Sequence, residues 1–175
     1  MYNKKSYLKK LVRIRAGTYR KSDSGLFLDR NERSTPLNNK IKQDLKKRLS
    51  KINLGQYPDL EKFYIKLSKW IKLPRNQIYL TEGVSGGIKS LVETLTIPGK
   101  SNIIFPTPTF ALYPVYCKMF NIKIKNISYD LNYSLKLDNI LRLIDNNTAV
   151  IFIPNPNMPI EGMLKYKDIL KLAKI

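Results

Sequence analysis

The stretch from Gln77 to Leu95 constrains the fold most, because its hydrophobic pattern changes period within a few residues. It begins with a short apolar run, Ile78-Tyr79-Leu80, which predicts a buried strand over residues 77–81. Glu82-Gly83 interrupts that run, and apolar residues then recur three and four positions apart, which is typical of one helix face. These apolar residues are Ile88, Leu91, Val92 and Leu95. The segment therefore predicts a strand, a glycine turn and a helix.

The start of this helix is a candidate anion site. Such a turn would point several free backbone N–H groups out of the helix start, where the helix dipole also favours negative charge. Gly86 and Gly87 have no side chain, so a phosphate could approach the backbone closely, and the Ser85 hydroxyl is a further donor. The alternative interpretation is an ordinary glycine turn, which is common in α/β proteins.

The rest of the chain continues the alternation of strands and helices. Strands are predicted at residues 102–105, 121–127 and 148–153, and helices at residues 36–51, 60–71, 84–95, 110–120, 137–144 and from 166 onward. Asp59 is predicted to cap the second helix, and Trp70 within it is predicted to be a core residue. The pattern predicts an α/β fold, with a mainly parallel sheet covered by helices on both faces and preceded by an N-terminal arm.

Three segments follow predicted strand ends, where parallel sheets bind their ligands. Residues 82–87 offer backbone N–H groups, residues 106–110 offer the aromatic ring of Phe110, and residues 154–162 offer amide side chains. Together they suit a flat, phosphorylated heteroaromatic ligand. The structural alternative for Phe110 is a core aromatic that caps the sheet.

Composition narrows the classes of function. The chain has no histidine and one cysteine, Cys117, which excludes histidine-dependent nucleophiles and an intrachain disulfide, and no metal site is predicted. The net charge of +19 raises nucleic-acid binding as an alternative, but the excess is mostly dispersed lysine rather than arginine. No apolar run is long enough for a membrane span or a secretory signal, so a cytoplasmic protein is expected.

The order of these segments resembles the fold-type I enzymes that use pyridoxal 5′-phosphate (PLP), in particular the group similar to histidinol-phosphate aminotransferase. The matching pieces are Leu28-Asp29-Arg30-Asn31-Glu32, Tyr57-Pro58-Asp59, Leu80-Thr81-Glu82-Gly83-Val84-Ser85, Pro98-Gly99, Pro106-Thr107-Pro108-Thr109-Phe110-Ala111-Leu112-Tyr113 and Asn155-Pro156-Asn157-Met158-Pro159. The resemblance implies that residues 1–53 form an arm and helix belonging to the small domain. Residues 54–175 would then be the first half of the PLP-binding large domain.

The resemblance also implies roles for individual residues. The backbone of Val84, Ser85 and Gly86 would hold the PLP phosphate, and Phe110 would stack on the pyridine ring. Tyr57 resembles a tyrosine that reaches the phosphate of a neighbouring subunit, which implies a homodimer if the fold is completed. Asn31 and Glu32 resemble a segment that passes near the substrate.

The chain departs from the family pattern at the amide loop. The family loop ends in Asn-Pro-Thr-Gly, and its asparagine donates to the phenolic oxygen of the cofactor. Met158 stands at that position here, and methionine cannot donate a hydrogen bond. Asn157 would replace this donor if the loop shifts.

The second departure is length, since family members are roughly twice as long. No lysine of this chain falls in the family's Schiff-base motif, so no catalytic residue is predicted here and a truncated or split enzyme is expected. The predicted strand over residues 77–81 would stand apart from the other three strands.

The function implied is amino-group transfer between an amino acid and a 2-oxo acid or ketone. A decarboxylase of the threonine-phosphate type, a catalytically silent partner and a basic nucleic-acid-binding protein are the alternatives.

Overall fold

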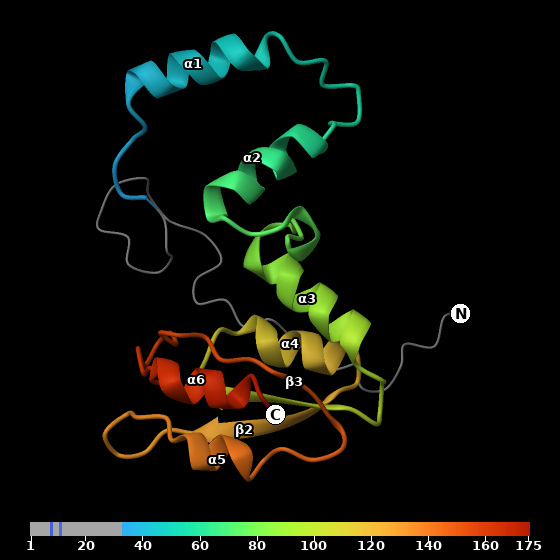
Figure 1. Ribbon diagram of the computed structural model, residues 1–175, viewed down its shortest axis with the longest axis vertical. Helices are drawn as coiled ribbons and strands as arrows, with labels where there is room; N and C mark the ends of the chain where they lie inside the picture. The colour runs from blue at the N-terminus through green and yellow to red at the C-terminus, as the bar shows by residue number, and fades with distance from the viewer. Residues whose placement is uncertain (1–7, 9–10, 12–32) are drawn as a thin grey trace. The chain divides into compact units, whose positions relative to one another are not determined.

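The computed structural model describes Leu8, Leu11 and residues 33–175 (Figure 1). The chain divides into one unit of residues 1–14 and 80–175 and another of residues 15–79. The expected domain division after residue 53 stays a prediction. In the described part of the chain, no helix combines the length and apolar character that a bilayer span requires.

The unit of residues 15–79 contains α1 (Asn39–Leu49), α2 (Glu61–Ile71) and the 3₁₀ helix η2 (Arg75–Gln77). The predicted start of the first helix at Pro36 is wrong by three residues. The Asn38 side chain caps α1 by accepting a hydrogen bond from Lys40 N at 2.8 Å, so the helix begins after Asn38. The predicted role of Asp59 is confirmed, since its Oδ1 accepts from Glu61 N at 3.0 Å.

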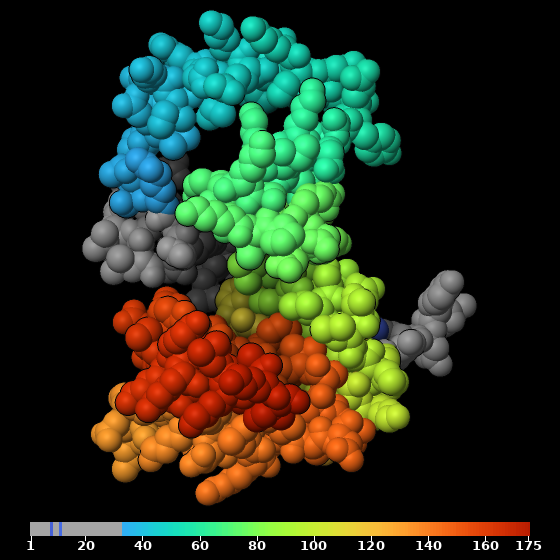
Figure 2. All heavy atoms as spheres, in the orientation of Figure 1, coloured from blue at the N-terminus to red at the C-terminus, as the bar shows by residue number. Residues whose placement is uncertain are grey.

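The prediction that Trp70 is a core residue is wrong, because its side chain is 80% exposed. Tyr64 is the buried residue of α2, and the guanidinium carbon of Arg75 lies 3.9 Å from its ring centre. At 100° per residue, Trp70 lies about 120° around the helix from Tyr64 and so faces elsewhere. In α1 no residue is buried, and Figure 2 shows open space between α1 and α2.

The unit of residues 80–175 is built on three parallel strands in the order β2-β1-β3. The strands are β1 (Asn102–Thr107), β2 (Lys123–Ser128) and β3 (Thr148–Ile151). Ile103 of β1 pairs with Ile124 on one side and Val150 on the other. The predicted parallel α/β sheet is confirmed.

Helices cover both faces of this sheet (Figure 1). They are α3 (Gly83–Leu95), α4 (Leu112–Met119), α5 (Leu137–Leu141) and α6 (Tyr166–Leu172). Ile103 and Phe105 pack in one core with residues of α3 and α4, whereas Ile104 packs in a second core with residues of α5 and α6. Adjacent strand residues point to opposite faces, so the apolar run of β1 supplies both cores.

The predicted strand over residues 77–81 is wrong. Gln77 ends η2, and residues 78–81 belong to neither a helix nor a strand. Ile78 has extended dihedral angles, φ −118° and ψ 127°, so the local conformation matches the prediction. A strand also needs a partner ladder, and within the described residues the three paired strands are β1, β2 and β3.

Candidate functional site

The start of α3 is uncapped by any side chain in the described chain. Glu82 occupies the N-cap position without a side-chain hydrogen bond to the helix. Gly83 has φ +69°, a conformation that favours glycine, and its N–H donates to Thr81 O at 2.7 Å. The next N–H groups, of Val84 and Ser85, precede the point at which the helix supplies its own acceptors. Val84 is exposed and Ser85 half-buried, so this end of α3 can accept an anion.

The glycines of α3 also have a role in packing within the chain. A Cβ at Gly86 would lie 3.3 Å from Glu82 Cβ and 3.5 Å from Thr81 Cβ, and one at Gly87 would lie 3.4 Å from Thr81 Oγ1. The Thr81 hydroxyl in turn donates to Gly83 O at 2.7 Å. The missing side chain of Gly86 therefore lets the turn fold back on the helix, in addition to keeping the backbone accessible, whereas 3.4 Å at Gly87 is an ordinary van der Waals distance.

The loop between β1 and α4 presents Phe110, whose side chain is 40% exposed. Its ring meets Tyr113 edge to face, with ring centres 6.3 Å apart. Tyr113 is buried against Phe105 and Phe152, at centre distances of 5.6 and 4.9 Å, and this burial raises the pKa of its hydroxyl. Phe110 is thus held at the rim of an aromatic cluster and remains open to a flat ligand.

The loop between β3 and α6 presents Asn157, whose side chain is fully buried. Its Oδ1 accepts from Thr109 Oγ1 at 2.7 Å, and its Nδ2 donates to Pro108 O at 2.8 Å and to the Tyr129 hydroxyl at 2.5 Å. These bonds join the β1–α4 and β3–α6 loops at the carboxyl end of the sheet. Met158, the next residue, is 64% exposed.

The structure therefore brings together two of the three predicted segments directly. The third, at the start of α3, belongs to a helix whose Ile88 and Val92 share a core with Tyr113 of α4. Tyr57 is fully exposed and lies in the other unit, so its role stays a prediction. Asn31 and Glu32 lie outside the described residues.

Sequence reasoning missed Thr109 and Tyr129, the two side chains that bind Asn157. Tyr129 follows β2 and is 28 positions from Asn157, and Thr109 is 48 positions away. No local pattern links residues so far apart in sequence. Thr109 carries a hydroxyl, adjoins Phe110 and follows a predicted strand. Its position was the one local signal that could have marked it as a candidate site residue.

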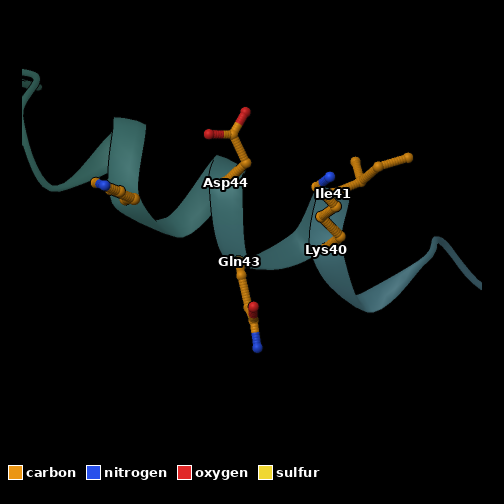
Figure 3. A pocket seen from close by; sticks show the side chains of 5 residues that line it. Lys40, Ile41, Gln43 and Asp44 are labelled. Carbon is orange, nitrogen blue, oxygen red and sulfur yellow. The ribbon is translucent and has the colours of Figure 1, made fainter.

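Each unit carries a surface hollow among its described residues. One of about 400 Å³ lies beside the β1–α4 loop and is lined by Phe105, Thr107, Pro108, Thr109, Pro114, Lys118, Ile124 and Asn126. The other lies on α1, and Figure 3 shows that the side chains of Gln43 and Asp44 leave the helix in different directions rather than converging. Among the described residues, no three aspartate, glutamate or cysteine side chains gather into a metal site.

The sequence model of the family "Aminotransferase class I and II" matches residues 23–175. The histidinol-phosphate aminotransferase of Buchnera aphidicola subsp. Melaphis rhois is 33% identical over 132 residues, which are 73% of this chain and 36% of that protein. The enzyme of the same name from Methanococcus aeolicus is 29% identical over 154 residues, which are 86% of this chain and 41% of that protein. The chain thus spans well under half the length of these relatives.

Solved structures show the same fold. Cystalysin from Treponema denticola, a structure that contains a pyridoxal 5′-phosphate cofactor, has a TM-score of 0.68 at 22% identity and covers 78% of this chain. The histidinol-phosphate aminotransferase from Clostridium acetobutylicum has a TM-score of 0.64 at 22% identity with the same coverage. This chain covers 37% of the first of these proteins and 39% of the second.

Proposed function

Since this chain belongs to the family of class I and II aminotransferases, we propose that it forms the N-terminal part of a PLP-dependent aminotransferase. The substrates proposed are an amino-acid donor and a 2-oxo acid or ketone acceptor. Histidinol phosphate is one candidate donor, because the similar curated proteins carry that name.

The observation that carries the proposal is the junction of two loops at the carboxyl end of the sheet. The loop that presents Phe110 and the loop that contains Asn157 are joined by hydrogen bonds from Thr109 and to Pro108. Ligands of parallel α/β sheets bind outside the carboxyl ends of the strands. The junction supports a ligand site bounded by an aromatic ring and by a loop fixed beside it.

The start of α3 fits the phosphate of the proposed cofactor. The N–H groups of Val84 and Ser85 precede the helix's own acceptors, and no side chain of the described residues caps this end. The Ser85 hydroxyl supplies another donor, and the missing side chain of Gly86 keeps the backbone close. In this proposal the positive end of the helix dipole adds to the binding of the dianion.

Phe110 is proposed to hold the flat face of the cofactor ring. Its partial exposure leaves ring surface available, while its edge-to-face contact with Tyr113 fixes its orientation. Stacking of this kind contributes roughly 0.5–1.5 kcal/mol beyond burial. When bound, PLP would supply an electron sink for the carbanion that forms on the amino substrate.

The loop of residues 155–162 would hold the cofactor without a hydrogen-bond donor on the side chain at position 158. Met158 offers only a weakly accepting sulfur. The Asn157 amide donates both of its hydrogens within the chain, to Pro108 and Tyr129, and is fully buried. In this conformation, Asn157 therefore has no amide hydrogen free for the phenolic oxygen.

The fully exposed Tyr57 is proposed to contact the phosphate of a second subunit in a homodimer. A cytoplasmic location and completion of the site by further polypeptide belong to the same proposal. The chain's 36–41% coverage of its curated relatives supports the need for such completion.

Binding of pyridoxamine 5′-phosphate, measured by equilibrium dialysis, tests the proposal. This amino form carries no aldehyde and so cannot react with the 24 lysines of the chain. We expect tighter binding than that of pyridoxamine or of inorganic phosphate. Phe110→Leu should weaken binding roughly three- to tenfold, given the stacking energy.

Phe120→Leu is the matched control, because Phe120 packs partly buried against the core that contains Tyr113 but lies at the other end of α4 from Phe110. Binding no tighter than that of inorganic phosphate would refute the cofactor assignment. Equal weakening by the two leucine variants would refute the role of Phe110.

A further inference from the structure

The buried amide of Asn157 lies where three loops meet. We propose that Asn157 is a positioning residue that fixes the Phe110 loop (residues 107–111) to the Met158 loop (residues 155–162), and does not itself touch the ligand. The inference relies on the proposed function for the identity of that ligand, while the coupling of the loops follows from the geometry alone.

The hydrogen bonds of Asn157 use both of its amide donors and also its carbonyl oxygen. An asparagine side chain has two N–H donors and a carbonyl oxygen that can accept up to two hydrogen bonds. Here both donors are used, by Pro108 O and the Tyr129 hydroxyl, and the acceptor receives the Thr109 hydroxyl. The side chain has no accessible surface. A ligand could reach this amide only if existing bonds broke first.

The backbone of Asn157 is held as firmly as its side chain. Its N–H donates to Gly162 O at 3.2 Å, and its carbonyl accepts from Glu161 N at 2.5 Å. An antiparallel bridge between residues 157 and 162 closes the loop on itself. Because the loop is closed on one side of Asn157 and bonded to Pro108 and Thr109 on the other, movement of either loop strains the other.

Tyr129 braces the junction from a third loop, which follows β2. Its hydroxyl meets Asn157, and its ring lies so close to Gly162 that a Cβ there would be 2.5 Å from Tyr129 Cε1. One tyrosine therefore contacts both ends of the bridge that closes the Met158 loop. Tyr129 was not among the site residues predicted from the sequence.

The two side chains that bond to each other are each next in sequence to a residue of the candidate site. Phe110 directly follows Thr109, and Met158 directly follows Asn157. The position of the ring relative to the loop opposite is therefore set by one amide and its hydroxyl partner. Loss of that contact should loosen both loops together and leave the strands intact.

Hydrogen–deuterium exchange on the full chain tests this coupling. Thr109→Val removes the hydroxyl that donates a hydrogen bond to Asn157 Oδ1, whereas Thr109→Ser keeps this hydroxyl. We expect Thr109→Val to speed exchange about tenfold in peptides covering residues 107–111 and residues 155–162, with residues 102–106 of strand β1 unchanged. Thr109→Ser should match the wild type, and Tyr129→Phe should loosen the Met158 loop from the other side.

Faster exchange confined to residues 107–111 in Thr109→Val would overturn the proposal, as would equal exchange in the valine and serine variants. Pyridoxamine 5′-phosphate binding is measured on the same samples. Coupled loops in a wild-type chain that does not bind this ligand would refute the proposed function but leave the coupling established. Weaker binding by Thr109→Val with unchanged exchange would refute positioning, because Thr109 would then act directly.

Discussion

Lys125 and Asp145 form an ion pair in which Nζ lies 2.6 Å from Oδ2. Lys125 is on β2, and Asp145 lies in the turn between α5 and β3. The same Nζ donates to Leu143 O at 2.6 Å, and the other carboxylate oxygen accepts from Asn102 Nδ2 at 2.8 Å and from Asn147 N at 2.9 Å. This network joins all three strands near their amino ends, opposite the candidate site.

Lys125→Met should destabilise the protein. The Lys125 side chain is 18% exposed, so a methionine side chain can fill most of the same volume. The substitution removes the hydrogen bond to Leu143 O and the positive charge beside Asp145. We expect the hydrogen bond alone to contribute about 1–2 kcal/mol to the free energy of unfolding. Urea denaturation measures this change. Lys123→Met, at an exposed position of the same strand, should change the free energy of unfolding by less than about 0.5 kcal/mol.

The same network predicts a loss of stability in acid. The hydrogen bond from Lys125, followed by those from Asn102 and Asn147, holds the pKa of Asp145 well below its usual value. The folded state therefore binds fewer protons than the unfolded state, and the stabilisation is present above about pH 4 and decreases as the pH falls below it. Urea midpoints between pH 7 and pH 3 should fall more steeply for the wild type than for Asp145→Asn. Parallel slopes would contradict this assignment.

Cys117 should be unreactive in the folded protein. It is buried in the core shared by α3 and α4, and burial raises the pKa of its thiol to about 12. The thiolate is the reactive form, so a disulfide reagent should label the protein only after unfolding. The chain has one cysteine, which makes the signal unambiguous. Rapid labelling of the native protein at pH 8 would show that this core opens.

The raised pKa of Cys117 also predicts a loss of stability in alkali. The unfolded thiol ionises near pH 9 and the folded one near pH 12, so its contribution to stability is full below about pH 9 and is lost as the pH rises toward 12. Cys117→Ala should remove this part of the alkaline decline in the urea midpoint. If the urea midpoint of Cys117→Ala fell with pH as steeply as that of the wild type, groups other than Cys117 would cause the loss of stability in alkali.

Gly162→Ala should destabilise the Met158 loop. Its Cβ would lie 2.5 Å from Tyr129 Cε1 and 2.8 Å from Tyr133 O, and a backbone atom cannot move aside cheaply. We expect a cost of roughly 1–3 kcal/mol in the free energy of unfolding. Gly87→Ala is the contrasting variant, because its Cβ would be 3.4 Å from Thr81 Oγ1 inside a helix, where alanine gains up to about 1 kcal/mol. Thermal or urea unfolding of the two variants should therefore move in opposite directions.

The sequence determined the elements whose signals are local. The strand patterns of β1, β2 and β3 and the period of α3 each lie within a dozen residues, and the structure confirms these elements with ends shifted by a few residues. The alternation of strands and helices was enough to predict a parallel sheet. It also predicted that Phe110 and Asn157 follow strand ends, because strand direction is fixed once the sheet is parallel.

Only the tertiary structure decided what depends on distant partners. Ile78 is extended, but residues 78–81 join no strand of the described sheet, because a strand is completed by a neighbour that the local sequence does not supply. Trp70 is exposed although it lies in an apolar pattern, since burial depends on what packs against that face. The hydrogen bonds of Asn157 go to Thr109 and Tyr129, dozens of residues away, so no local pattern could predict these partners. Sequence periodicity specifies which way a side chain points, whereas the folded chain determines what it meets there.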